Sequence, residues 1–94
     1  MIARTLRVQN RTGLHARPAS LFAETAGRFK SRILVTVGSQ EVDGRSVLGL
    51  MLLEAISGVE LTIKAEGEDE VGAVDALAEL VERDFDETQG GQVG

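Results

Sequence analysis

The chain has 94 residues, no cysteine, a single histidine and a formal net charge of −5. This length suits one domain, and the lack of cysteine excludes disulfides, thiolate metal sites and a cysteine nucleophile. One histidine excludes paired-histidine metal sites, and the acidic balance without Tyr or Trp disfavours nucleic acid. We see no signal peptide and no apolar run of membrane-spanning length, so we expect a soluble cytoplasmic protein without membrane insertion.

Four segments have the alternating apolar pattern or the turn context of β-strands. They are residues 2–8, 33–37, 40–43 and 59–65. A tight hairpin turn at Gly38-Ser39 joins the second to the third, because glycine tolerates positive φ. In the last strand Glu60, Thr62 and Lys64 alternate with apolar residues, which predicts a sheet with one solvated face carrying these side chains.

Three helices are predicted around these strands. The first begins at His15 and runs to about residue 28, with a buried stripe of Phe22, Ala26 and Phe29. The second is short and covers residues 47–53. The third follows an Asp69 N-cap and carries apolar residues at helical spacing as far as Phe85.

The resulting element order is β-α-β-β-α-β-α. Strands and helices mixed in one small domain predict a single sheet with helices over one face. We assign this domain to residues 1–87. Residues 88–94 are polar and glycine-rich, and we expect a frayed tail there.

The segment from Thr12 to Ser20 places the only histidine at the start of the first helix, and Pro18 suits the first helical turn. Free N–H groups and the helix dipole at that end would favour a neutral imidazole at His15. They would then hold a phosphoryl group bonded to it, together with the guanidinium of Arg17. No general base or nucleotide-binding loop accompanies His15, so another protein would supply the group. The alternative is a histidine that satisfies only its own hydrogen bonds.

Basic residues are concentrated before residue 33. They are Arg4, Arg7, Arg11, Arg17, Arg28, Lys30 and Arg32. We interpret them as a basic patch beside His15 that steers acidic protein partners. Ordinary solvated surface charge is the alternative interpretation.

Ser46 precedes the short apolar helix, and its simplest role is that of an N-cap. Phosphorylation of Ser46 is the second interpretation. A phosphate would add about −1.5 to −2 charges beside an apolar surface and hinder docking without unfolding the domain. Val47, Leu48 and Met51 are predicted to form an exposed partner surface on this helix, unless a loop or the first helix covers them.

Two motifs resemble those of a known family. Residues 13–19 read Gly-Leu-His-Ala-Arg-Pro-Ala, which resembles the active-site motif of HPr, the histidine-containing phosphocarrier family of the phosphoenolpyruvate-dependent phosphotransferase system. Residues 45–51 read Arg-Ser-Val-Leu-Gly-Leu-Met and are similar to the regulatory serine segment of that family. The resemblance covers roughly residues 1–86. It implies an α+β open-faced β-sandwich, with a four-stranded antiparallel sheet and three helices on one face.

The resemblance also implies a stoichiometric carrier for sugar uptake, not an enzyme, with no metal and no cofactor beyond the covalent phosphoryl group. Enzyme I would phosphorylate His15 on Nδ1, EIIA-type domains would receive the group, and Arg17 would stabilise it in transit. Ser46 would be the target of the HPr kinase/phosphorylase, and the modified chain would act with a transcriptional regulator. We expect a monomer. The predicted partner-binding residues are Ala16, Ser20, Val47, Leu48 and Met51.

Three other hypotheses stay open. The first is a regulatory adaptor in which Ser46 phosphorylation is the main event. The second is a paralogue of the nitrogen-related branch, because Leu48 replaces a methionine of many sugar-system members and Glu54 adds a charge. The third, an unrelated small α/β binding module, requires both motifs to be accidental.

Overall fold

The computed structural model describes residues 1–8, 16–53 and 58–83. Its elements confirm the predicted order β-α-β-β-α-β-α. They are β1 (Ile2–Arg7), α1 (Ala16–Ala26), β2 (Arg32–Val37), β3 (Gln40–Asp43), α2 (Val47–Leu52), β4 (Glu60–Glu66) and α3 (Glu70–Glu82). Phe85 and the predicted tail over residues 88–94 lie outside the described residues.

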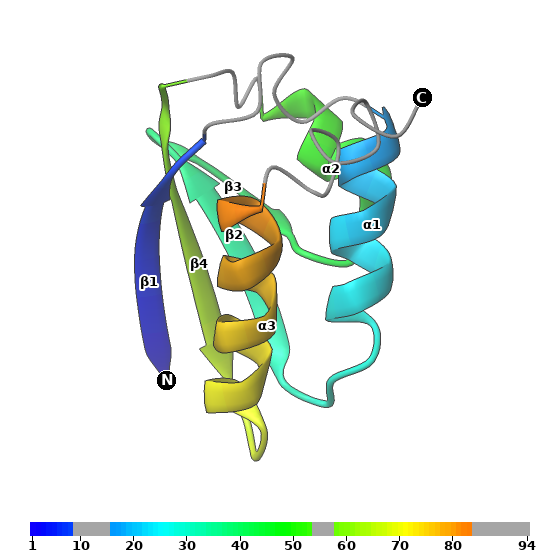
Figure 1. Cartoon of the computed structure of the whole chain (residues 1–94), viewed down its shortest axis with the longest axis vertical. Coiled ribbons are helices and arrows are strands. Elements are labelled where there is room, and N and C mark those ends of the chain that lie inside the picture. The colour runs from blue at the N-terminus through cyan, green and yellow to red at the C-terminus, as the bar shows by residue number, and fades with distance from the viewer. Residues whose placement is uncertain (9–15, 54–57, 84–94) are drawn as a thin grey trace.

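The strands form one antiparallel sheet in the order β1-β4-β2-β3. All three helices lie on one side of this sheet, with α1 and α3 next to each other and α2 packed beside α1 (Figure 1). No described segment covers the other side, so the predicted open-faced β-sandwich is confirmed. None of the helices in the described part has the length and apolar character needed to cross a membrane.

The core lies between the helices and the covered side of the sheet. Its fully buried side chains include Phe22 of α1, Ile63 of β4 and Leu77 of α3. The predicted stripe of α1 is correct for Phe22 and Ala26, but Phe29 is only half-buried. The helix ends at Ala26. After it, the N–H groups of Arg28 and Phe29 donate to the carbonyl oxygens three residues earlier, which tightens the last turn.

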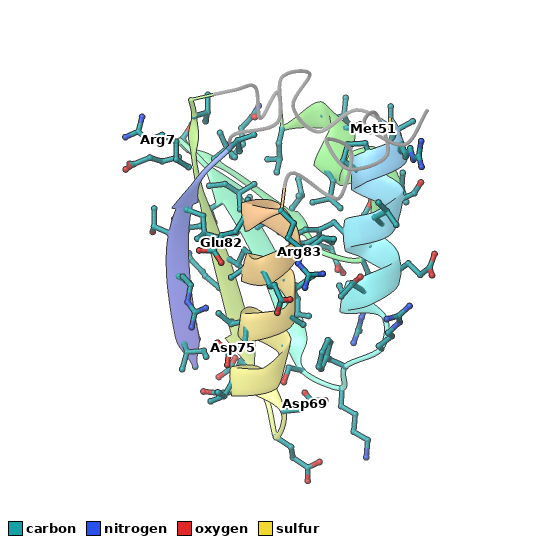
Figure 2. All side chains as sticks on the ribbon, in the orientation of Figure 1. Arg7, Met51, Asp69, Asp75, Glu82 and Arg83 are labelled. Atoms are coloured by element: carbon teal, nitrogen blue, oxygen red, sulfur yellow. The ribbon has the colours of Figure 1, made fainter. Side chains whose placement is uncertain are left out.

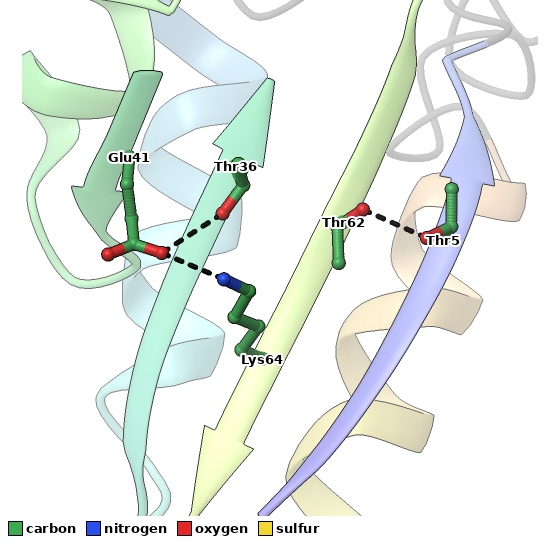
Figure 3. Close-up of polar contacts among 5 residues, drawn as sticks. All are labelled: Thr5, Thr36, Glu41, Thr62 and Lys64. Atoms are coloured by element: carbon green, nitrogen blue, oxygen red, sulfur yellow. Dashed lines mark hydrogen bonds and ion pairs between the residues drawn. The ribbon is translucent and has the colours of Figure 1, made fainter. Parts of the chain in front are cut away.

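The uncovered side of the sheet carries Glu60, Thr62 and Lys64, as predicted. Its polar side chains bind one another across the strands (Figure 3). The Thr5 and Thr62 hydroxyls lie 2.9 Å apart, and Lys64 Nζ donates to Glu41 Oε2 at 3.1 Å. The hydrogen bond and charge of Lys64 hold the pKa of Glu41 below its ordinary value. On this side of the sheet Lys64 is therefore paired with Glu41, and the two threonine hydroxyls are paired with each other.

Asp69 occupies the predicted N-cap position of α3, but its side chain makes no capping hydrogen bond. Its Oδ1 accepts from Ser31 N at 2.9 Å and from Ser31 Oγ at 2.5 Å, and its Oδ2 accepts from Lys30 N at 2.8 Å. Figure 2 labels Asp69 at the end of the molecule where this loop between α1 and β2 meets α3. The predicted capping role is thus wrong, because a neighbouring loop offers three donors instead.

Replacing Asp69 by asparagine should lower the thermal midpoint by several degrees at neutral pH, because an amide accepts fewer of these hydrogen bonds. The Ser31 hydroxyl, then the Lys30 N–H, holds the pKa of Asp69 below its ordinary value. The contribution of Asp69 is therefore fully present above the unfolded-state pKa of about 3.9 and disappears as the pH falls through the lower folded-state pKa. Thermal melts of both proteins over an acid pH series test this, and a stability difference that widens toward acid pH would contradict it.

Candidate functional site

The first turn of α1 and the whole of α2 lie at the same end of the molecule (Figure 1). α1 begins at Ala16, and His15, the residue directly before it, lies outside the described residues. Ala16, Arg17 and Ser20 are exposed, whereas Pro18 and Ala19 are buried. The third helical residue is Pro18, whose missing N–H leaves no intrahelical bond unmade in a first turn. The buried pair therefore anchors the turn, and Ala16, Arg17 and Ser20 stay accessible.

Ser46 caps α2, as predicted. Its backbone is extended, with φ −96° and ψ 108°, and its Oγ accepts a hydrogen bond from Gly49 N at 3.0 Å. A Cβ at Gly49 would lie 3.1 Å from both Ser46 Oγ and Val42 Cβ. Glycine at this position therefore allows the close contact between α2, its cap and β3.

An apolar surface on α2, which we call the α2 patch, consists of Leu48, Met51 and Leu52. These side chains are 68%, 41% and 64% exposed. Val47, which was predicted to belong to the surface, is half-buried and packs against the core. Leu52 was not predicted, although the spacing i, i+3, i+4 from Leu48 puts it on the same face. Figure 2 shows Met51 beside the first turns of α1.

The described residues of the predicted basic patch do not gather beside the start of α1. Arg28, Lys30 and Arg32 come after α1, and a helix of 11 residues is about 16 Å long. The chain therefore carries them to the opposite end, away from Arg17. Arg7 lies on β1, far from α1 in Figure 2, and its guanidinium bonds to the carbonyl of Gly58 at 3.1 Å.

Arg4, which interrupts the apolar alternation of β1, is also paired, with a side chain of α3. Its Nη2 donates to Asp75 Oδ1 of α3 at 2.7 Å. Of the described residues of the predicted basic patch, Arg17 thus lies at the start of α1. Arg11 lies outside the described residues. Across residues 1–8, 16–53 and 58–83, no three acidic or histidine side chains gather as a metal-binding group.

Comparison with known proteins agrees with this arrangement. Residues 2–83 match the family described as "PTS HPr component phosphorylation site". The phosphocarrier protein HPr of Treponema pallidum is 41% identical over 87 residues, which cover 93% of this chain and 99% of the relative. The crystal structure of HPr-C-His from Thermoanaerobacter tengcongensis is 42% identical and superimposes with a TM-score of 0.88, covering 93% and 98% of the two chains.

The family match and these relatives define the class of the protein: it is a phosphocarrier and not an enzyme. The chain belongs to the HPr family of the phosphotransferase system.

Dimers occur among the structural relatives. The catabolite repression protein Crh of Bacillus subtilis is 42% identical, with a TM-score of 0.70 and coverage of 88% of this chain and 95% of that chain. Its crystal structure is described as a dimer with a swapping domain. The monomeric state expected here therefore stays a prediction.

Proposed function

We propose that this chain accepts a phosphoryl group on His15 from phosphorylated enzyme I and passes it to EIIA-type domains, acting as a cytoplasmic monomer. One observation carries the proposal: in a chain of the HPr family, the only histidine directly precedes a helix whose first turn exposes Arg17. EIIA-type domains of the sugar branch are the proposed acceptors. Those of the nitrogen-related branch are the alternative, because Leu48 stands where many sugar-system members have methionine and is 68% exposed on the α2 patch.

The transfer exchanges one phosphorus–nitrogen bond for another. A neutral imidazole nitrogen of His15 attacks the phosphorus on enzyme I, and the bond to the donor histidine breaks as the new bond forms. The phosphoryl oxygens carry negative charge throughout, so positioning and electrostatic stabilisation dominate the rate. Arg17, exposed two residues after His15, would supply planar guanidinium donors to those oxygens.

The direct test is the intact mass of the protein after incubation with enzyme I and phosphoenolpyruvate. We expect the mass of one phosphoryl group to be added and to be lost in acid, because the phosphorus–nitrogen bond is acid-labile. No added mass with an enzyme I that phosphorylates another HPr would contradict the carrier role.

The α2 patch, with Ala16 and Ser20 of α1, is the proposed docking surface for both partners. Replacing Leu48 by asparagine should raise the KM for phosphorylated enzyme I by roughly tenfold with little change in kcat, because apolar contact area is lost. The same replacement at Val71 is the matched control, since this side chain is 60% exposed but belongs to α3. Steady-state transfer kinetics would contradict the assignment if both variants behaved alike.

Ser46 is the proposed regulatory site, modified by the HPr kinase/phosphorylase. Replacing Ser46 by aspartate should lower kcat/KM for transfer from enzyme I, because a negative charge then borders the α2 patch. Asparagine is the matched control, since both residues are good N-caps and only aspartate is charged. Equal transfer rates for the two variants would leave Ser46 with its capping role alone.

A regulatory adaptor is the second candidate function, supported by the similarity to the catabolite repression protein Crh. In this function the phosphorylated Ser46 segment would bind a transcriptional regulator, and the His15 transfer would be minor. Phosphorylation of Ser46 by the kinase, together with no transfer from an active enzyme I, would favour the adaptor.

A further inference from the structure

Arg45, the residue before Ser46, extends away from α2 toward the loop that joins α1 to β2. Its Nη2 donates to the carbonyl oxygen of Phe29 at 2.5 Å and to that of Ser31 at 3.2 Å. Its own backbone N–H donates to Asp43 Oδ1 at 2.8 Å, and the N–H of Ser46 donates to the Asp43 carbonyl at 3.0 Å. Side-chain and backbone contacts thus fix the turn over residues 43–46 immediately before the cap of α2.

The loop that receives Arg45 is itself held from a third element. Asp69, at the start of α3, binds both backbone N–H groups at Lys30 and Ser31 and the Ser31 hydroxyl. Ser31 is buried, with 1% of its surface exposed. Gly67 packs so closely that a Cβ there would lie 2.7 Å from Ser31 Oγ. A continuous series of hydrogen bonds therefore runs from α3 through this loop to Arg45 and the Ser46 turn.

We propose that Arg45 is a positioning residue for the phosphorylation of Ser46, and that Asp69 supports it through the Phe29–Ser31 loop. This rests on the proposed modification of Ser46. In that reaction Ser46 Oγ attacks the γ-phosphorus of ATP, the new oxygen–phosphorus bond forms, the bond to the leaving ADP oxygen breaks, and the hydroxyl proton passes to a base of the kinase. The attack requires one placement of Oγ, and a turn that is ordered before docking loses little conformational freedom on binding.

The guanidinium of Arg45 explains why arginine suits this position. Two carbonyl oxygens from different residues accept from the same end of the side chain. A charged donor to two carbonyls forms stronger hydrogen bonds than a neutral one. Since this end of the guanidinium is occupied by backbone oxygens, we assign its main role to the ordering of the turn.

The experiment compares the kcat/KM for Ser46 phosphorylation by the HPr kinase/phosphorylase and ATP in the full chain and its variants. Arg45→Met keeps an unbranched apolar stem but removes the guanidinium donors, and should lower this value by roughly tenfold. Amide hydrogen exchange at Gly49, whose N–H bonds to Ser46 Oγ, should become faster in the same variant. The kcat for phosphorylation of His15 by enzyme I should stay within about twofold of the wild-type value, because Arg45 bonds to the Phe29–Ser31 loop and not to the first turn of α1.

Two further variants separate positioning from direct contact with the kinase. Arg28→Met is the charge-matched control, because Arg28 is exposed and, among the described residues, pairs only with Glu24 of α1, four residues earlier. It should leave the rate of Ser46 phosphorylation unchanged. Asp69→Asn alters a side chain on α3, and should lower the rate by about threefold through the loop. In the double variant with Arg45→Met, the two effects should be less than additive.

The outcomes are distinct when all assays are run below the melting midpoint of each variant. A wild-type rate for Arg45→Met overturns the positioning role while leaving Ser46 as a phosphorylation site. A reduced rate for Arg45→Met with a wild-type rate for Asp69→Asn means direct kinase contact and also overturns it. If Arg45→Met is poorly folded, Arg45→Lys, which keeps one donor group, takes its place. Its rate of Ser46 phosphorylation should be lower than that of the wild type, and its amide hydrogen exchange at Gly49 should be faster. No phosphorylation of the wild-type chain by an active kinase removes the proposed modification and this inference together.

Discussion

Replacing His15 by alanine is expected to abolish phosphorylation by enzyme I and phosphoenolpyruvate, because the only histidine of the chain is removed. No other side chain carries an imidazole nitrogen, so no alternative acceptor of the same chemistry exists in the sequence. Intact mass spectrometry measures the effect. The far-UV circular dichroism and the thermal midpoint should stay close to those of the wild type.

The same variant separates the two proposed phosphorylation sites. With the HPr kinase/phosphorylase and ATP, the His15→Ala protein should still gain one phosphoryl group at Ser46, as an acid-stable ester. An acid-labile group that persists in His15→Ala after treatment with enzyme I would contradict the carrier assignment.

Replacing Arg17 by alanine is expected to lower the kcat of phosphoryl transfer by roughly a hundredfold or more, with a smaller change in KM. The guanidinium is accessible at the start of α1 and would stabilise charge on the phosphoryl group chiefly while it is in transit. Rapid-quench kinetics with phosphorylated enzyme I measure the rate of the transfer step. Lysine at this position should recover only part of the rate, because it lacks the planar donor pair.

Arg28→Ala serves as the control for Arg17→Ala. Arg28 is also exposed, but it lies beyond the other end of α1. The Arg28→Ala variant should accept the phosphoryl group from enzyme I at the wild-type rate. If Arg17→Ala raised KM and left kcat unchanged, Arg17 would contribute to docking and not to the transfer itself.

The regular elements could be predicted from the sequence because their signals are local. The alternation of Glu60, Thr62 and Lys64 with apolar residues located β4 and also its solvated side. Serine before an apolar run located the start of α2, and the Ser46 cap has the expected bond to Gly49. These features depend on residues that are close together in the sequence, so the sequence alone is enough to predict them.

The contacts that join distant segments could not be predicted in the same way. Asp69 has the sequence context of an N-cap, yet its carboxylate binds the Lys30–Ser31 backbone across the fold. Arg45 binds carbonyl oxygens, which every residue possesses, so no side-chain type marks its partners. The prediction of a basic patch was wrong for Arg28, Lys30 and Arg32 for a related reason, because α1 separates them in space from Arg17.

The position of the α2 patch has a consequence for the kinetics of the proposed relay. On the uncovered side of the sheet Thr5 binds Thr62 and Lys64 binds Glu41. The side chains of the α2 patch, in contrast, are apolar and exposed near the start of α1. Donor and acceptor proteins would then compete for the same docking surface. The carrier would have to dissociate from the donor before it binds the acceptor. Throughput would depend on how quickly each complex dissociates, and an excess of either unloaded partner would slow the relay by sequestering the carrier.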